Sequence, residues 1–106
     1  MNVTICRANA DDVGGLTKLF NEYRVFFGRD SDLSLAEDFL RTRLNNSESV
    51  IFCAYTSDKH CVGFAQLYPS FSSVLAKHIW ILNDLFLSLI HISEPTRLGM
   101  ISYAVF

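Results

Sequence analysis

Two polar residues, Asn83 and Asp84, stand side by side in the most apolar run of the chain, residues 78–88. The run is rich in β-branched, aromatic and leucine side chains, which predicts a long central β-strand buried on both faces. A buried polar group without a partner costs about 1–3 kcal/mol. We therefore expect a bulge, a bend or a ligand at this pair, which is the first candidate for a functional site. The plain alternative is a chance polar pair at a frayed strand end.

The cysteine and histidine residues raise the question of a metal site, because thiolate and imidazole groups bind zinc. Cys53 and Cys61 are separated by a predicted hairpin, and the chain has no Cys-x-x-Cys or His-x₃-His spacing that would join them to His60 or His78. Cysteines on buried strands are the commoner explanation, so no metal is predicted. Cys6 lacks an identifiable histidine and acid partner and is not favoured as a nucleophile.

The composition indicates one globular domain with ample material for a core. Of 106 residues, 50% are hydrophobic and 19% are charged, which lies outside the disordered class. The net charge of −2 gives no general attraction to nucleic acid or to anionic lipid, so neither partner is expected. The apolar run at residues 79–92 is too short and too polar to cross a bilayer. Three cysteines without framework spacing indicate a reducing, cytoplasmic setting.

The first half of the chain predicts a short strand at residues 3–7 and then two helices. Asn9 or Asp11 can cap the first helix, in which five apolar residues fall at helical spacing. These residues are Val13, Leu16, Leu19, Phe20 and Tyr23. Ser34 and Glu37 form a capping-box pattern that predicts the start of the second helix.

The connection between the two helices is predicted at residues 24–32, with Gly28 as the helix breaker. It carries two adjacent aromatic residues, Phe26 and Phe27, which must find cover. They can form a hydrophobic plug between the helices or one wall of an acceptor pocket, and the sequence leaves both possibilities open.

Three strands joined by short connections complete the pattern. Residues 50–55 and 61–68 form a predicted hairpin with a turn at residues 57–59. Pro69 and Ser70 are expected to end the second strand of this hairpin before the central strand begins. The order is strand, two helices and three strands, which predicts an α+β fold with a mainly antiparallel sheet.

This order of elements, together with two segments of sequence, resembles the N-terminal half of the GCN5-related N-acetyltransferase superfamily. The segments are residues 63–69, Gly-Phe-Ala-Gln-Leu-Tyr-Pro, and residues 80–87, Trp-Ile-Leu-Asn-Asp-Leu-Phe-Leu. Many members of the family pair a G-x-x-x-L strand with a strand that carries an acidic or amide residue followed by Asp-Leu-Phe-Val. The resemblance covers residues 2–88 and implies a partial family fold, β-α-α-β-β-β, without its C-terminal half.

The resemblance implies an enzyme that moves an acetyl group from acetyl-CoA, its co-substrate, to an amine. In the family the fourth strand bulges and splays from the fifth, and acyl-CoA lies in the V-shaped cleft between them. Backbone N–H groups near Leu85, Phe86 and Leu87 would then bind the cofactor, facing the thioester carbonyl and the pantetheine. Donors that point at a developing oxyanion contribute roughly 3–4 kcal/mol each.

The same resemblance places the amine acceptor against the region between the helices, where Tyr23, Arg24 and Phe27 would line its pocket. Asn83 and Asp84 become the candidate catalytic residues, because some family members use a glutamate base at the position of Asn83. Asparagine cannot act as a base at neutral pH. Asp84 is the neighbouring carboxylate, but in a regular strand it points to the opposite face. A catalytic role and a structural role therefore both stay open for Asp84.

After Ser88 the family pattern breaks. A glycine-rich turn that opens a helix and holds the CoA pyrophosphate is expected there, but residues 97–100 contain a single glycine. The string from Leu89 instead resembles a translated sequencing adapter. We expect residues 1–88 to be the N-terminal part of an acyltransferase domain, residues 89–106 to be a non-native tail, and the chain to be an inactive fragment.

A second interpretation is a non-catalytic α+β module that binds a partner or dimerises through an exposed sheet edge. The missing pyrophosphate turn favours this interpretation for the chain itself, whereas the family pattern favours the enzyme for its parent gene. An unpaired edge also predicts a homodimer or aggregation. The amine acceptor stays open between a polyamine, an amino acid, an aminoglycoside and a protein terminus.

Overall fold

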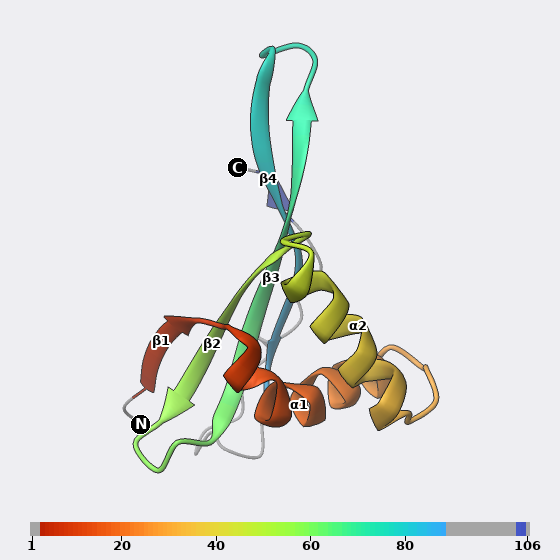
Figure 1. Cartoon of the computed structure of the whole chain (residues 1–106), viewed down its shortest axis with the longest axis vertical. Helices are drawn as coiled ribbons and strands as arrows, with labels where there is room; N and C mark the ends of the chain where they lie inside the picture. The colour runs from red at the N-terminus through yellow and green to blue at the C-terminus, as the bar shows by residue number, and fades with distance from the viewer. Residues whose placement is uncertain (1–2, 89–103, 106) are drawn as a thin grey trace.

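The computed structural model describes residues 3–88 and the backbone of residues 104–105 (Figure 1). Its elements are β1 (Val3–Arg7), the 3-10 helix η1 (Ala10–Asp12), α1 (Val13–Phe26), α2 (Leu33–Asn45), β2 (Val50–Thr56), β3 (Cys61–Ser72), β4 (Lys77–Leu87) and β5 (Ala104–Val105). The predicted α+β class and the predicted order of two helices and four strands are confirmed. The expected tail, apart from β5, lies outside the described residues.

The strands form one antiparallel sheet in the order β1-β2-β3-β4-β5, and both helices pack on one face of it (Figure 1). The middle position belongs to β3, whereas β5 pairs only with Ile81 and Leu82 of β4. The expectation that β4 is central and buried on both faces was wrong, since Asp84 is the only buried residue in it. The reason is that no layer of the described residues covers the second face of the sheet.

The core lies between α1 and the sheet, and α1 contributes to it the predicted apolar stripe. All five residues of the stripe are buried, and Val13 and Leu16 are 0% exposed. They pack together with Ile51 of β2. Asn9, one of the two predicted caps, caps the 3-10 helix η1 that leads into α1: its side chain accepts a hydrogen bond from the Asp11 N–H at 2.8 Å. The N-cap of α1 itself is Asp12, whose side chain makes no capping hydrogen bond. The stripe therefore fixes which face of α1 meets the sheet.

The second helix begins earlier than predicted and uses a different cap. Asp32 has an extended backbone (φ −156°, ψ 90°), and its carboxylate accepts a hydrogen bond from the Leu35 N–H at 3.0 Å. Ser34 already lies within the helix, so the predicted capping box of Ser34 and Glu37 was wrong. The Asp32 N–H donates to the Asn21 side chain at 2.8 Å, and this bond from α1 fixes the chain at the cap.

The connection between the helices leaves its aromatic residues half covered. The first helix continues to Phe26, and Gly28, with φ 87°, ends it as predicted. Phe26 and Phe27 are 59% and 51% exposed, respectively. They therefore do not form the closed hydrophobic plug that was one of the two expectations.

The β3–β4 hairpin is longer than predicted. β3 continues through Pro69, which pairs with Trp80, so the expectation that Pro69 and Ser70 end this strand was wrong. β2 pairs with β3 no further than Leu67, and on such an edge the missing N–H of proline costs no ladder hydrogen bond. Figure 1 shows the far half of the hairpin projecting beyond the helices.

Candidate functional site

A β-bulge lies at the predicted polar pair in β4. Leu82 pairs with Leu67 and Asp84 pairs with Gln66, so Asn83 is an extra residue without a partner in β3. A bulge of this kind bends the strand and changes the direction of nearby side chains. The expected bulge is confirmed, and a chance pair at a frayed strand end is excluded because β3 pairs with β4 on both sides of it.

The bulge places Asn83 and Asp84 on the same face of the sheet. The Asn83 Nδ2 atom donates a hydrogen bond to Asp84 Oδ1 at 3.0 Å, and both residues line one cavity. The expectation that Asp84 points to the opposite face was wrong, because the extra residue shifts the alternation of side chains by one position. The two candidate catalytic residues can therefore act on the same ligand.

Asp84 is the centre of a buried network of side chains. It is 8% exposed, and besides Asn83 it accepts hydrogen bonds from Tyr23 Oη at 2.8 Å and from Gln66 Nε2 at 3.0 Å. Gln66 is 0% exposed, and its Oε1 accepts from Ser49 Oγ at 2.8 Å. Hydrogen bonds to a charged group contribute about 1.5–3 kcal/mol each, so the network ties α1, β3 and β4 together at the bulge.

The tyrosines around Asp84 are held in the neutral form. Burial, and then the hydrogen bond and negative charge of Asp84, raise the pKa of Tyr23 well above its ordinary range. Burial followed by the charge of Asp84 raises the pKa of Tyr68 to about 12, with Arg43 acting in the opposite direction. Both hydroxyl groups are therefore hydrogen-bond donors at neutral pH.

A cavity of ≈ 380 Å³ lies beside the bulge, between α1, α2 and the sheet. Its walls are Phe20, Tyr23, Arg24, Leu35, Phe39, Tyr68, Asn83 and Asp84. The cavity thus brings two of the three predicted acceptor residues, Tyr23 and Arg24, together with both candidate catalytic residues. Phe27 is not in its wall; the Phe27 ring packs edge-on against the Tyr23 ring, with 5.1 Å between centroids.

Sequence reasoning missed Tyr68 and Gln66, although a signal for both was present. They are two residues apart in the predicted strand at residues 61–68, so they point to the same face of the sheet. A polar pair on the helix-covered face of a strand needs a partner. Asp84 is that partner for Gln66, at 3.0 Å.

The outer edge of β4 after the bulge presents backbone groups. The Ser88 N–H donates to the Val62 carbonyl oxygen in β3 at 2.7 Å. Because N–H groups alternate in direction along an antiparallel strand, that of Phe86 points to β3, and those of Leu85 and Leu87 point to the outer edge. Within the described part of the chain, β5 covers this edge only ahead of the bulge.

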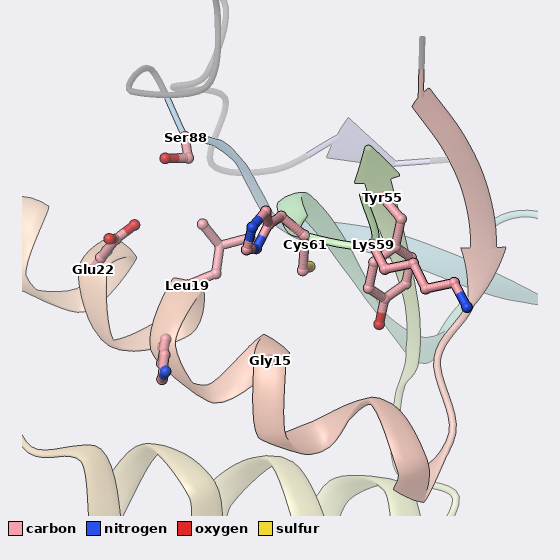
Figure 2. Close-up of a pocket in the computed structure, with 9 residues that line it drawn as sticks. Gly15, Leu19, Glu22, Tyr55, Lys59, Cys61 and Ser88 are labelled. Carbon is pink, nitrogen blue, oxygen red and sulfur yellow. The ribbon is translucent and has the colours of Figure 1, made fainter. Parts of the chain in front are cut away.

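A second cavity, of ≈ 240 Å³, lies between α1 and the β2–β3 hairpin. Figure 2 shows Leu19 and Glu22 of α1 facing Cys61 across it. A hydrogen bond with Cys53 lowers the pKa of the Cys61 thiol, and the same contact, together with burial, raises that of Cys53. Residues 3–88 contain no group of three or more His, Cys, Asp or Glu side chains arranged to hold a metal ion.

Two curated proteins align with the chain over most of its length. It is 50% identical over 84 residues to the uncharacterized N-acetyltransferase YhfO of Bacillus subtilis, which covers 79% of this chain and 56% of that protein. It is 32% identical over 71 residues to a probable acetyltransferase of Haemophilus influenzae. This alignment covers 67% of this chain and 49% of that protein. The chain therefore spans about half the length of the curated relatives that it matches. No protein-family model matches it.

Solved structures agree with the sequence relatives. The crystal structure of a probable acetyltransferase is 39% identical and superposes with a TM-score of 0.77 over 89% of this chain and 60% of the other. A ribosomal-protein-alanine N-acetyltransferase from Brucella melitensis, which is 15% identical, has the same fold. It superposes with a TM-score of 0.72 over 88% of this chain and 62% of the other. Neither described helix has the length and hydropathy needed to span a membrane.

Proposed function

Because this chain belongs to the GCN5-related N-acetyltransferases, we propose that it forms part of an enzyme that transfers an acetyl group from acetyl-CoA to a primary amine. The observation that carries the proposal is the bulge of β4. At this point a strand edge that no other described residue pairs with lies next to a cavity that contains a buried carboxylate. The edge is assigned to the acyl donor and the cavity to the amine.

The outer edge of β4 fits the pantetheine arm of acetyl-CoA, a co-substrate that supplies the acyl thioester. The outward N–H groups of Leu85 and Leu87 are donors for a ligand that lies along this edge like an added strand. Donors fixed in this way stabilise negative charge on an acyl oxygen, by about 3–4 kcal/mol for one donor. Phe86 contributes packing instead, with its ring 5.5 Å from the Tyr23 ring.

The cavity beside the bulge fits a small amine. Its volume of ≈ 380 Å³ lies within the range of about 300–1,000 Å³ that is usual for small-molecule sites. Among the described residues that line the cavity, Asp84 is the only carboxylate, and it attracts an ammonium group. Three donors occupy it, and a carboxylate offers about four lone-pair directions, so one is left for the amine. The Asn83 amide lies beside Asp84 and orients the same amine.

The experiment tests whether the bulge is needed for transfer. A chimera joins residues 1–88 to the C-terminal part of the Bacillus subtilis relative, and release of the CoA thiol is measured with a panel of amines. Deleting Asn83 removes the extra residue and restores a regular ladder. We expect the deletion variant to fold but to lose about 100-fold or more in kcat/KM, the order expected when reacting groups are misplaced by about 1 Å.

The matched control is Asn83→Ala, which keeps the bulge and removes only the amide. It is expected to retain more activity than the deletion variant. A deletion variant as active as the parent chimera contradicts the role of the bulge. A chimera that releases no thiol with any amine, while the intact relative does, contradicts the proposed function itself.

A further inference from the structure

Arg24 is a cation in the cavity wall, and part of its guanidinium group is without a partner among the described residues. Its Nη1 atom is buried and has no hydrogen-bond partner among the described residues. Within residues 3–88, no carboxylate lies within ion-pair distance of its guanidinium group. A guanidinium does not lose its proton in proteins. A buried donor without a partner costs about 1–3 kcal/mol, and a charged donor costs more. An anion bound to the Arg24 guanidinium would satisfy this donor.

The other arginine in contact with this region is already occupied. Arg43 Nε donates to Glu48 Oε1 at 2.7 Å, and its guanidinium stacks over the Phe39 ring at 4.6 Å from the centroid. Arg24 is therefore the cation that has binding capacity for a ligand in the cavity. The negative charge of the cavity is on Asp84, so the two opposite charges come from different elements, α1 and β4.

The geometry points to an amine acceptor that also carries a carboxylate, that is, a small amino acid. Its carboxylate binds the Arg24 guanidinium, and its amino group lies by Asp84 at the bulge, next to the edge of β4. A guanidinium fork matches a carboxylate in two parallel hydrogen bonds. This inference rests on the proposed function, since it names the class of amine that the cavity receives.

The charge of Arg24 also argues against two of the acceptors that the sequence left open. A polyamine or an aminoglycoside brings several positive charges, and one of them would lie near the Arg24 guanidinium in a partly buried cavity. Like charges brought together away from water repel strongly. An amino acid instead provides one charge of each sign, matching the one cation and one anion of the wall.

The test measures binding to the 106-residue chain by NMR chemical-shift changes, without acetyl-CoA. The probes are glycine, L-leucine and γ-aminobutyrate, each compared with its own amide, which keeps the ammonium group and loses the carboxylate. We expect at least one acid to bind about tenfold or more tightly than its amide. In Arg24→Gln the ratio of the two affinities falls close to one. The control Arg29→Gln removes an exposed arginine from the adjacent connection and leaves the ratio unchanged.

Arg24→Lys provides a second variant if Arg24→Gln does not fold. It keeps the positive charge but lacks the planar fork, so its ratio lies between those of the parent chain and Arg24→Gln. The inference is overturned if acids and amides bind equally, or if the preference for acids survives both variants. The chimera provides an independent test. If its kcat/KM is equal for acids and amides, this inference alone is overturned. If acids bind selectively but no acetyl group is transferred, only the proposed function is overturned.

Discussion

At the scale of single residues, Asp84 determines the chemistry of its surroundings. Its carboxylate accepts hydrogen bonds from Tyr23, Gln66 and Asn83, which come from α1, β3 and β4. The same charge helps to keep the hydroxyls of Tyr23 and Tyr68 protonated. One buried acid thus holds three elements together and sets the protonation of two neighbours. Asp84 therefore has the structural role that the sequence left open, through hydrogen bonds from three side chains.

This arrangement predicts a loss of stability at high pH. In the unfolded chain tyrosine has an ordinary pKa of about 10, whereas the folded protein keeps Tyr68 protonated up to a pKa of about 12. The unfolded state therefore binds fewer protons between these values, and the free energy of unfolding falls as the pH rises. The stabilisation is fully present below pH ~10 and is lost by pH ~12.

Urea unfolding of the parent chain and of Tyr68→Phe, followed from pH ~9 to pH ~11.5, measures the effect. The comparison isolates the contribution of Tyr68, because every other titratable group is the same in the two proteins. The variant is expected to show the shallower decline. Parallel curves for the two proteins would mean that Tyr68 ionises equally in the folded and unfolded states.

At the scale of elements, caps and bulges decide where side chains point. Asp32 caps α2, although Ser34 and Glu37 offered the more familiar pattern. In β4, one extra residue turns Asp84 toward the helices. Both devices change a boundary or an alternation by one or two positions. The cap and the bulge leave α2 and β4 in place, so the fold does not depend on them. The cavity does depend on them, because they decide which side chains line it.

Exchanging the two candidate caps tests this assignment. Asp32→Ala removes the side-chain acceptor of the Leu35 N–H and should lower the free energy of unfolding by about 1 kcal/mol. Ser34→Ala, an equally exposed neighbour within the helix, should change it by less than about 0.5 kcal/mol. Urea denaturation of both variants provides the measurement. The reverse order of effects would restore the capping box that the sequence predicted.

The sequence predicted the parts of the fold that depend on local pattern. The stripe from Val13 to Tyr23 fixed the buried face of α1, and the polar pair at Asn83 and Asp84 located the bulge. Features that depend on contacts between residues far apart in the chain could not be predicted from the sequence. The cap of α2 depends on a hydrogen bond from α1, and the wall formed by Tyr68 depends on which face of β3 the helices cover.

At the scale of the whole molecule, the two faces of the sheet differ. The helices cover one face, and the other carries an apolar groove of ≈ 260 Å³ whose lining includes Ile5, Phe52, Leu85 and Leu87. Ile5 and Phe52 are 62% and 37% exposed. Exposed apolar patches and unpaired strand edges favour association. The homodimer or aggregate that the sequence suggests, and the non-catalytic module, stay open at this scale.

In the part of the chain that the structure describes, the edge of β4 after the bulge and the sheet face opposite the helices are uncovered. This predicts that the 106-residue chain binds acetyl-CoA weakly and does not turn over. Among the described residues, the edge of β4 after the bulge provides one wall for the ligand, and one wall covers less than the roughly 70–90% of ligand surface that small-molecule sites usually bury. Calorimetric titration is expected to show no binding in the micromolar range, whereas the chimera binds. Micromolar affinity of the 106-residue chain itself would contradict the prediction.

The projecting β3–β4 hairpin extends β4 beyond the body of the protein, so that its far end is accessible to other molecules. Beyond the helices, the hairpin is held by its own ladder and by a row of rings, with Phe71 5.4 Å from His78 and His78 5.2 Å from Trp80. Segments with so little packing open separately from the body of a protein. Because β4 runs from this tip through the bulge without interruption, loosening the tip frees the strand that carries Asp84. A molecule that binds the tip tightly would instead stiffen β4 and its bulge from a distance.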